Sequence, residues 1–282
     1  MKKFFRLCLL LLCLVFFQEI LFSRVVEYSI CRKLQEHMEE TEEFRQMKIS
    51  PDNWKKLQRF SKKEQVDFFE CLAALMVEYD FSLDREMNFS SVRLKRNLSF
   101  YQEKKPETFA KLAASYKKII GDLVYFPVAA PSGKKEFFFE NGYGTPRSYG
   151  GKRIHEGIDI FGKKEESGYY PVISMSAGIV EQVGWLPLGG YRVGIRSPEG
   201  CYFYYAHLSS YGKKFRVGDK IYPGEFLGLM GDTGYGPEGT RGRFPVHLHL
   251  GIYIEDRNKE EMSINPYSLL VLLENQIQQY QY

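Results

Sequence analysis

The strongest constraint on the fold is a change in sequence texture near Gly121. Before this point, apolar residues recur at helical spacing among many charged residues. After it, short runs of β-branched and aromatic residues are separated by turn signals such as Gly189-Gly190. A chain of 282 residues is long enough for two regions that each bury a core. We therefore expect a helical domain or stalk over residues 24–121 and a mainly β domain over residues 122–282.

Serine and proline mark the predicted helix starts in residues 24–121. Ser50 precedes Pro51, which is the pattern of a cap followed by proline at the first helical position. Residues 61–64, Ser-Lys-Lys-Glu, have the pattern of a capping box and precede apolar residues at helical spacing. Pro106 opens another amphipathic segment. These signals predict helices, and none of the segments carries a catalytic constellation.

Residues 122–282 have the pattern of an all-β fold. Short predicted strands at regular spacing indicate an antiparallel β sandwich or barrel. The chain has no P-loop or G-x-S-x-G motif, so P-loop nucleotide binding and serine hydrolysis have no support. The strands are expected at residues 123–128, 178–185, 191–196, 201–207, 226–230 and 246–254.

The N-terminus has the pattern of a secretion signal. Lys2, Lys3 and Arg6 precede an unbroken apolar run over residues 7–17, and apolar residues continue to Phe22. The segment is just long enough to cross a bilayer, and a small-x-small cleavage site is poorly formed. We expect residues 1–23 to be an uncleaved transmembrane signal-anchor in the cell membrane, with the rest of the chain extracytoplasmic. Secretion after signal cleavage is the alternative, and a buried helix of a cytosolic domain is disfavoured by the basic flank.

Charge and cysteine content exclude other functions. The net charge of +4 is mild, and no basic stripe is interleaved with aromatic residues, so we expect no nucleic-acid partner. The five cysteines are far apart and form no C-x-x-C pair. A thiolate zinc site and a disulfide framework are therefore both disfavoured.

Four of the five histidines fall in the predicted β domain. His155 precedes Asp159 by four residues, and His207 ends a predicted strand. His247 and His249 are two residues apart, so in a strand both side chains would lie on one face. Each fragment alone is often incidental, but together they form a suitable donor set for zinc. A catalytic zinc site needs three protein ligands and an open position, which leaves two of these residues for acid–base chemistry.

The order of these motifs resembles the lysostaphin/LytM-type zinc metallopeptidases, which are peptidoglycan endopeptidases. The motifs are His-x-x-x-Asp at 155–159, Tyr-Ala-His at 205–207 and His-Leu-His at 247–249, within a resemblance that covers roughly residues 126–266. The turn at 217–221 and the glycine-rich segment at 228–234 also look like that family. The resemblance implies a small, mainly antiparallel β fold of the duplicated-hybrid-motif type, with a groove over the sheet.

The resemblance also implies a role for each residue. The zinc ligands would be His155, Asp159 and His249. His247 would be a general base or acid, and His207 would be its partner. Tyr149 falls where some members have a tyrosine that stabilises the oxyanion. The chain departs from the family in the longer segment at 235–245 and in Val246, which replaces a proline.

The function expected from this resemblance is zinc-dependent hydrolysis of peptide bonds in bacterial peptidoglycan, in the stem peptide or the cross-bridge. One alternative is a non-catalytic peptidoglycan-binding scaffold or activator in a cell-envelope or sporulation complex. In that case the helical region would bind envelope proteins. Another alternative is a zinc peptidase that cleaves a protein substrate. The complete ligand set favours an enzyme over the scaffold, and only substrate profiling separates the two peptidase alternatives.

Overall fold

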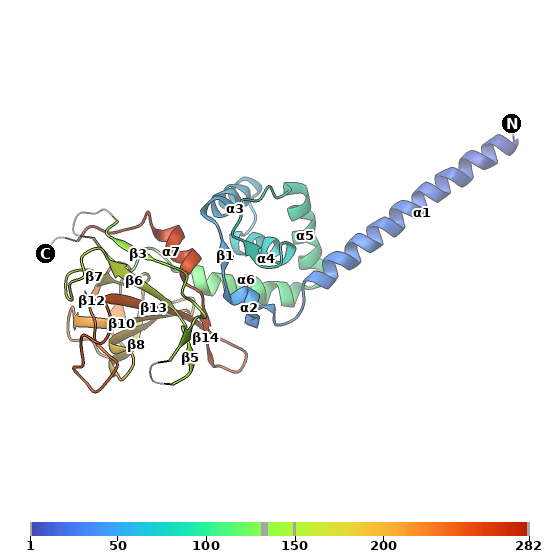
Figure 1. Cartoon of the computed structure of the whole chain (residues 1–282). Helices are drawn as coiled ribbons and strands as arrows, with labels where there is room; N and C mark the ends of the chain where they lie inside the picture. The colour runs from blue at the N-terminus through green and yellow to red at the C-terminus, as the bar shows by residue number, and fades with distance from the viewer. Residues whose placement is uncertain (1, 131–134, 149–150, 281–282) are drawn as a thin grey trace.

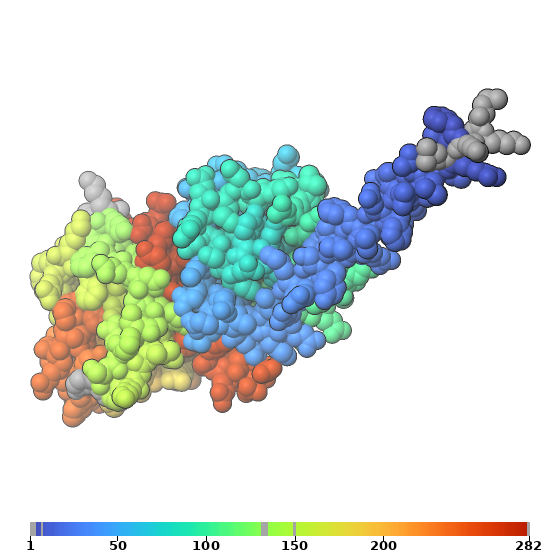
Figure 2. Space-filling view, turned by 45° about the vertical axis from the view of Figure 1, so that its right-hand side comes forward, coloured from blue at the N-terminus to red at the C-terminus, as the bar shows by residue number. Residues whose placement is uncertain are grey.

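The chain forms a long N-terminal helix, a helical region and a β-rich region, which follow one another in space as in sequence (Figure 1). The computed structural model describes residues 2–130, 135–148 and 151–280. Figure 2 shows the N-terminal helix projecting from the body of the molecule, whereas the helical region lies against the β-rich region. The expected mainly antiparallel β fold with a preceding helical region is confirmed.

Helix α1 (Lys2–Lys33) is continuous from the apolar N-terminal segment into the helical region. The described apolar side chains between Phe4 and Phe22 are largely exposed, whereas Ile30 and the following Leu34 are buried. Among the described residues, α1 is the one helix long and apolar enough to cross a membrane, a test that signal sequences also pass. The C-terminal end of α1 packs against α5 (Ser91–Lys104).

The helical region is built around α4 (Phe68–Glu78), in which residues 71–77 are all buried. Such a helix, apolar on every side, needs neighbours all round, and α3, α5 and α6 supply them. A short parallel pair, β1 with β2, completes the region. The remaining elements are η1 (Met38–Glu40), α2 (Glu42–Arg45), β1 (Lys48–Ile49), α3 (Pro51–Glu64), β2 (Ser82–Leu83) and α6 (Pro106–Ile120).

Two of the three predicted helix starts are correct. Ser50 caps α3 by accepting a hydrogen bond from the Asn53 amide, and Pro51 and Pro106 each begin a helix. The capping box at residues 61–64 is wrong, because Ser61 lies inside the last turns of α3 and donates to the Val66 carbonyl. Asp67 caps α4 instead, since its carboxylate accepts from two free amides of the first turn.

A ten-stranded antiparallel sheet forms the β-rich region. Its main path runs β11–β8–β9–β10–β13–β6–β3; β12 pairs with β10 and β7, and β14 pairs with β13. From Leu208 on, β10 pairs with β12 and no longer with β13, and its pairing with β9 shifts register between Tyr205 and Leu208. The strands are β3 (Phe137–Phe139), β6 (Ile158–Gly162), β7 (Pro171–Ile173), β8 (Gly178–Leu186), β9 (Gly190–Arg196), β10 (Tyr202–Tyr211), β11 (Lys220–Ile221), β12 (Phe226–Met230), β13 (His247–Glu255) and β14 (Glu261–Ile264).

The predicted strand at residues 123–128 is wrong. Pro127 has no amide hydrogen to donate, and the segment contributes only an isolated bridge at Val128. Phe126 instead stacks on Phe137 of β3, with ring centroids 4.5 Å apart, and so anchors this connection to the core. Helix α7 (Tyr267–Leu273) follows the sheet.

The helical and β-rich regions share one continuous cluster of buried apolar side chains. Helix α6 packs against β13, and α2 and the residue after it bond to the end of β14 and the following turn. The division into domains at residue 121 remains a prediction.

Candidate metal centre and active site

Two neighbouring strands bring the predicted ligands together. Asp159 of β6 and His249 of β13 are directly paired in the antiparallel ladder, so their side chains leave the same face of the sheet. Ile158 and Ile160 point to the opposite face and are buried. His155 precedes β6, and its backbone amide donates to the Thr145 carbonyl. Because successive side chains of β6 and β13 point to opposite faces of the sheet, the predicted ligands lie on one face and the core residues on the other.

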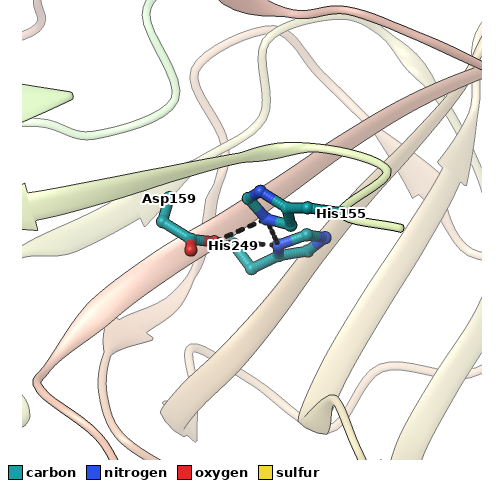
Figure 3. A group of neighbouring side chains, drawn as sticks. All are labelled: His155, Asp159 and His249. Carbon is teal, nitrogen blue, oxygen red and sulfur yellow. Dashed lines mark hydrogen bonds and ion pairs between the residues drawn. The ribbon is translucent and has the colours of Figure 1, made fainter. Parts of the chain in front are cut away.

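The three side chains converge on one point (Figure 3). His155 Nε2 lies 3.0 Å from Asp159 Oδ1 and 3.0 Å from His249 Nδ1. The third side of this triangle, from His249 Nδ1 to Asp159 Oδ1, is also 3.0 Å. The three atoms therefore form one nearly equilateral donor face.

This donor set fits a zinc ion. The Nδ1 atom of His155 lies 3.0 Å from the Gly142 carbonyl, so as a donor to that oxygen it leaves Nε2 with a lone pair. Three lone pairs that face one point repel one another unless a proton or a cation lies between them. Ligands of a tetrahedral zinc ion are about 3.4 Å apart, only slightly more than the separations here.

Gly157 provides the space for the His249 ring. A Cβ atom built at this position would lie 2.7 Å from Cε1 of His249 and 2.4 Å from the Leu250 carbonyl oxygen. Any larger residue would displace either the ring or strand β13. The glycine between His155 and Asp159 is thus required by the packing of a predicted ligand.

His207 reaches the site because β10 is irregular. Its φ of 63° lies in the left-handed region, at the register shift between Tyr205 and Leu208. Its Nδ1 atom lies 2.8 Å from the Thr233 carbonyl and is fixed as a donor to it. The Nε2 atom of the neutral ring is consequently an acceptor.

His247 is held in the same way. Its Nδ1 atom lies 2.8 Å from the Pro245 carbonyl, and its Nε2 atom lies 3.6 Å from Asp159 Oδ1. The rings of His207 and His247 are 4.7 Å apart between centroids. Backbone carbonyls thus set both imidazoles in the tautomer that carries a lone pair on Nε2.

The electrostatic environment keeps these imidazoles neutral. Burial lowers the pKa of His207 well below its usual value, and the neighbouring His247 and His249 lower it further. Burial also lowers the pKa of His247 and of His249, against the opposing effect of Asp159. Burial alone would raise the pKa of Asp159, but its contacts with the imidazoles of His155 and His249 hold it below its ordinary range. The site thus combines a carboxylate with neutral His207, His247 and His249.

A groove of about 380 Å³ opens over the three converging side chains. One wall comes from residues 235–245. Phe244 lies 4.5 Å from the His207 ring, and Tyr235 lies 4.7 Å from Phe244, in each case between ring centroids. Arg153, of the short strand β5 (Arg153–Ile154), donates to the Tyr235 hydroxyl at 3.1 Å. The long segment therefore forms an aromatic wall beside the two histidines.

All five predicted histidine and aspartate positions line this groove. Their assignment as ligands and acid–base groups stays a prediction. Tyr149 lies outside the described residues.

Arg147 was not predicted from the sequence. It lies on β4 (Pro146–Arg147), which pairs with β5 (Arg153–Ile154) immediately before His155. Its Nη2 atom donates to Asp159 Oδ2 at 2.7 Å. The same atom lies 3.0 Å from His155 Nδ1, which cannot accept from it while donating to the Gly142 carbonyl. The two oxygens of Asp159 thus have separate partners, one in the donor face and one in Arg147. In the sequence, Arg147 is marked only by its position eight residues before His155. An arginine at such a distance from a histidine is too common to indicate a functional site.

We predict that Arg147→Gln weakens zinc binding by about 10- to 100-fold, because Asp159 loses the partner that orients it. Arg147→Lys should restore only part of the affinity, since an ammonium group keeps the charge but lacks the planar fork. Competition with a chromogenic chelator measures the affinity, and a melting curve of each variant shows that it is folded. Wild-type affinity in Arg147→Gln would contradict this role.

Comparison with known proteins adds independent information. Residues 153–266 match peptidase family M23. The L-Ala–D-Glu endopeptidase of Bacillus subtilis is 40% identical over 161 residues, which are 56% of this chain and 46% of that protein. Lysostaphin of Staphylococcus simulans is 34% identical over 84 residues, 29% of this chain and 16% of that protein. The chain thus spans less than half the length of these curated relatives.

One solved structure matches far more of the chain. It is a candidate glycyl-glycine endopeptidase lytM from Ruminococcus gnavus, with a TM-score of 0.74 and 36% sequence identity. The match covers 89% of this chain and 97% of that one. Coverage this broad includes most of the helical region as well as the sheet.

Proposed function

Because this chain belongs to peptidase family M23, which includes LytM- and lysostaphin-type peptidases, we propose that it is a zinc-dependent endopeptidase acting on bacterial cell-wall peptidoglycan. One observation carries the proposal: three donor atoms converge on a point beside two neutral histidines, at the base of a groove. A scaffold that only bound the wall would not need this arrangement. The intact set favours catalysis over the non-catalytic alternative.

The residues divide into ligands and proton carriers. His155, Asp159 and His249 would hold zinc, which when bound polarises a carbonyl group and brings the pKa of water to about 7. The Nε2 atom of His247 would accept a proton from the attacking water. His207, as its partner across the site, would donate a proton to the developing oxyanion or the leaving amine. Because the Nε2 atom of neutral His207 is an acceptor, His207 would first take up a proton there, which the attacking water supplies through His247.

We also propose that α1 is a single uncleaved anchor in the cell membrane, with the catalytic region outside the cytoplasm. Its exposed apolar surface favours a lipid environment, and its far end is packed into the helical region. Secretion after cleavage is the alternative. Envelope proteins that bind the helical region would be further partners.

The whole chain in membranes should release new amino groups from purified peptidoglycan, and a chelator should abolish the release until zinc is restored. His247→Ala should lower the rate by at least about 100-fold, because the proton acceptor is lost. His37→Asn is a matched control, since His37 lies in the helical region and asparagine tolerates its left-handed backbone.

Activity in the growth medium after removal of the membranes would support secretion instead. A folded, zinc-loaded chain that releases nothing from several wall types would support the scaffold alternative.

Among wall peptides, we place the L-Ala–D-Glu bond first. The Bacillus subtilis relative is named for that bond, and the Ruminococcus gnavus structure for a glycyl-glycine bond. Arg147 and Arg153 both line the groove, and a guanidinium group binds a carboxylate in two parallel hydrogen bonds. A glutamyl residue in a peptide retains a free carboxylate, whereas a glycine bridge offers none. Charge complementarity therefore favours the acidic substrate.

Arg153→Gln should lower kcat/KM for a peptide with an Ala–D-Glu bond by about 10- to 100-fold, the equivalent of one charge-assisted hydrogen bond. The same variant should cleave the uncharged Ala–D-Gln analogue nearly as the wild type does, and its zinc affinity should not change. Tyr235→Phe is the matched control, because it removes the contact at 3.1 Å and keeps the arginine. Equal losses on both peptides would refute recognition of the carboxylate.

A further inference from the structure

We propose that the helical region positions the ligand His155, through Arg45, and thereby sets the metal affinity of the site. This proposal rests on the zinc site of the proposed function. It assigns the helical region a part in the metal centre in addition to its connection to α1.

Arg45, the last residue of α2, reaches across to the β-rich region. Its Nε atom donates to the Ser263 carbonyl at 2.9 Å. Its Nη2 atom donates to Ser263 Oγ at 2.8 Å and to the Tyr143 hydroxyl at 2.9 Å. Tyr143 is 8% exposed and Ser263 is 2% exposed, so water cannot easily replace these bonds. The Tyr143 hydroxyl also donates to the Ser263 carbonyl at 2.9 Å, so Arg45 and β14 together fix the Tyr143 side chain.

Asn141, two residues before Tyr143, is held by a second set of hydrogen bonds, through Asn265. Asn265 is 1% exposed, and its backbone amide donates to the Arg45 carbonyl at 2.8 Å. Its side-chain amide lies 3.1 Å from Gln46 Oε1 and 3.1 Å from Asn141 Oδ1. Residues 45–46 of the helical region thus contact Tyr143 directly and Asn141 through Asn265.

Gly142 lies between these two anchored residues, and it contacts the metal centre. Its carbonyl oxygen is the 3.0 Å partner of His155 Nδ1. A Cβ atom at this position would lie 3.4 Å from the same nitrogen, so the backbone runs directly along the ring. The partner of the distal nitrogen fixes the tautomer and orientation of a metal-bound histidine. Displacement of residues 141–143 would therefore change the aim of His155 Nε2.

A separate ion pair between the two regions does not involve residues 141–143. Lys117 of α6 pairs with Glu199 at 2.8 Å, in the turn between β9 and β10. This ion pair also connects the helical region to the sheet, but it lies far from residues 141–143 in sequence and bonds to a different strand pair. It provides a matched control for loss of an inter-region contact.

The test uses the full-length chain in detergent. Zinc affinity is measured by chelator competition, the coordination of bound Co²⁺ by its visible absorption, and folding by a melting curve. We expect Arg45→Gln and Tyr143→Phe each to weaken zinc binding by up to about tenfold and to alter the Co²⁺ spectrum. The double variant should lose little more than either single variant, because both changes break one connection. Lys117→Gln should bind zinc as the wild type does.

The outcomes separate this proposal from the assignment of the zinc site. Wild-type zinc affinity in folded Arg45→Gln and Tyr143→Phe would overturn positioning by the helical region and leave the zinc site intact. The same loss in Lys117→Gln would also overturn it, because any weakened contact would then suffice. Tyr143→Phe removes a single hydroxyl group, so it keeps the proposal testable if Arg45→Gln does not fold. Failure of the wild-type chain to bind zinc would instead refute the proposed metal centre.

Discussion

The antiparallel pairing of β6 with β13 is the interaction on which the site depends. It places Asp159 directly opposite His249 and buries the alternate residues of both strands in the core. A shift of one residue in this register would exchange the two faces and put the carboxylate among isoleucines and leucines. The hydrophobic core therefore enforces the geometry of the donor face. Because three lone pairs then face one another at 3.0 Å, metal binding and folding of this region should be thermodynamically linked.

The sequence predicts the parts of this arrangement that follow from local periodicity. Two histidines at positions i and i+2 of one strand must lie on one face, and prolines at first helical positions mark α3 and α6. Predictions fail where a tertiary contact decides between local signals. Ser61 and Asp67 are both plausible caps, and the extent of α3 selects Asp67. The same limit applies to Arg147, whose contact with Asp159 depends on the pairing of β4 with β5, which brings the arginine beside His155.

Backbone carbonyls have a larger part in the site than the sequence motifs suggest. Three histidines place Nδ1 against a carbonyl, of Gly142, Thr233 and Pro245 respectively. The motifs identify the rings, but the tautomer of each ring depends on a backbone carbonyl. That carbonyl lies 13 residues away for His155, 26 for His207 and 2 for His247. Because these loops are fixed by bonds of their own, the imidazoles are oriented before a ligand arrives, which lowers the reorganisation needed for binding and proton transfer.

The continuity of α1 with the helical region extends this dependence towards the membrane. Ile30 and Leu34 are buried at the end of the same helix whose first part is exposed and apolar. If α1 spans a bilayer, the helical region cannot rotate freely about a flexible linker, because no loop separates it from the anchor. The metal centre would then have a defined distance and orientation relative to the membrane. An enzyme held in this way reaches only the wall layer that lies within its fixed span, so anchoring would itself restrict which peptides are cut.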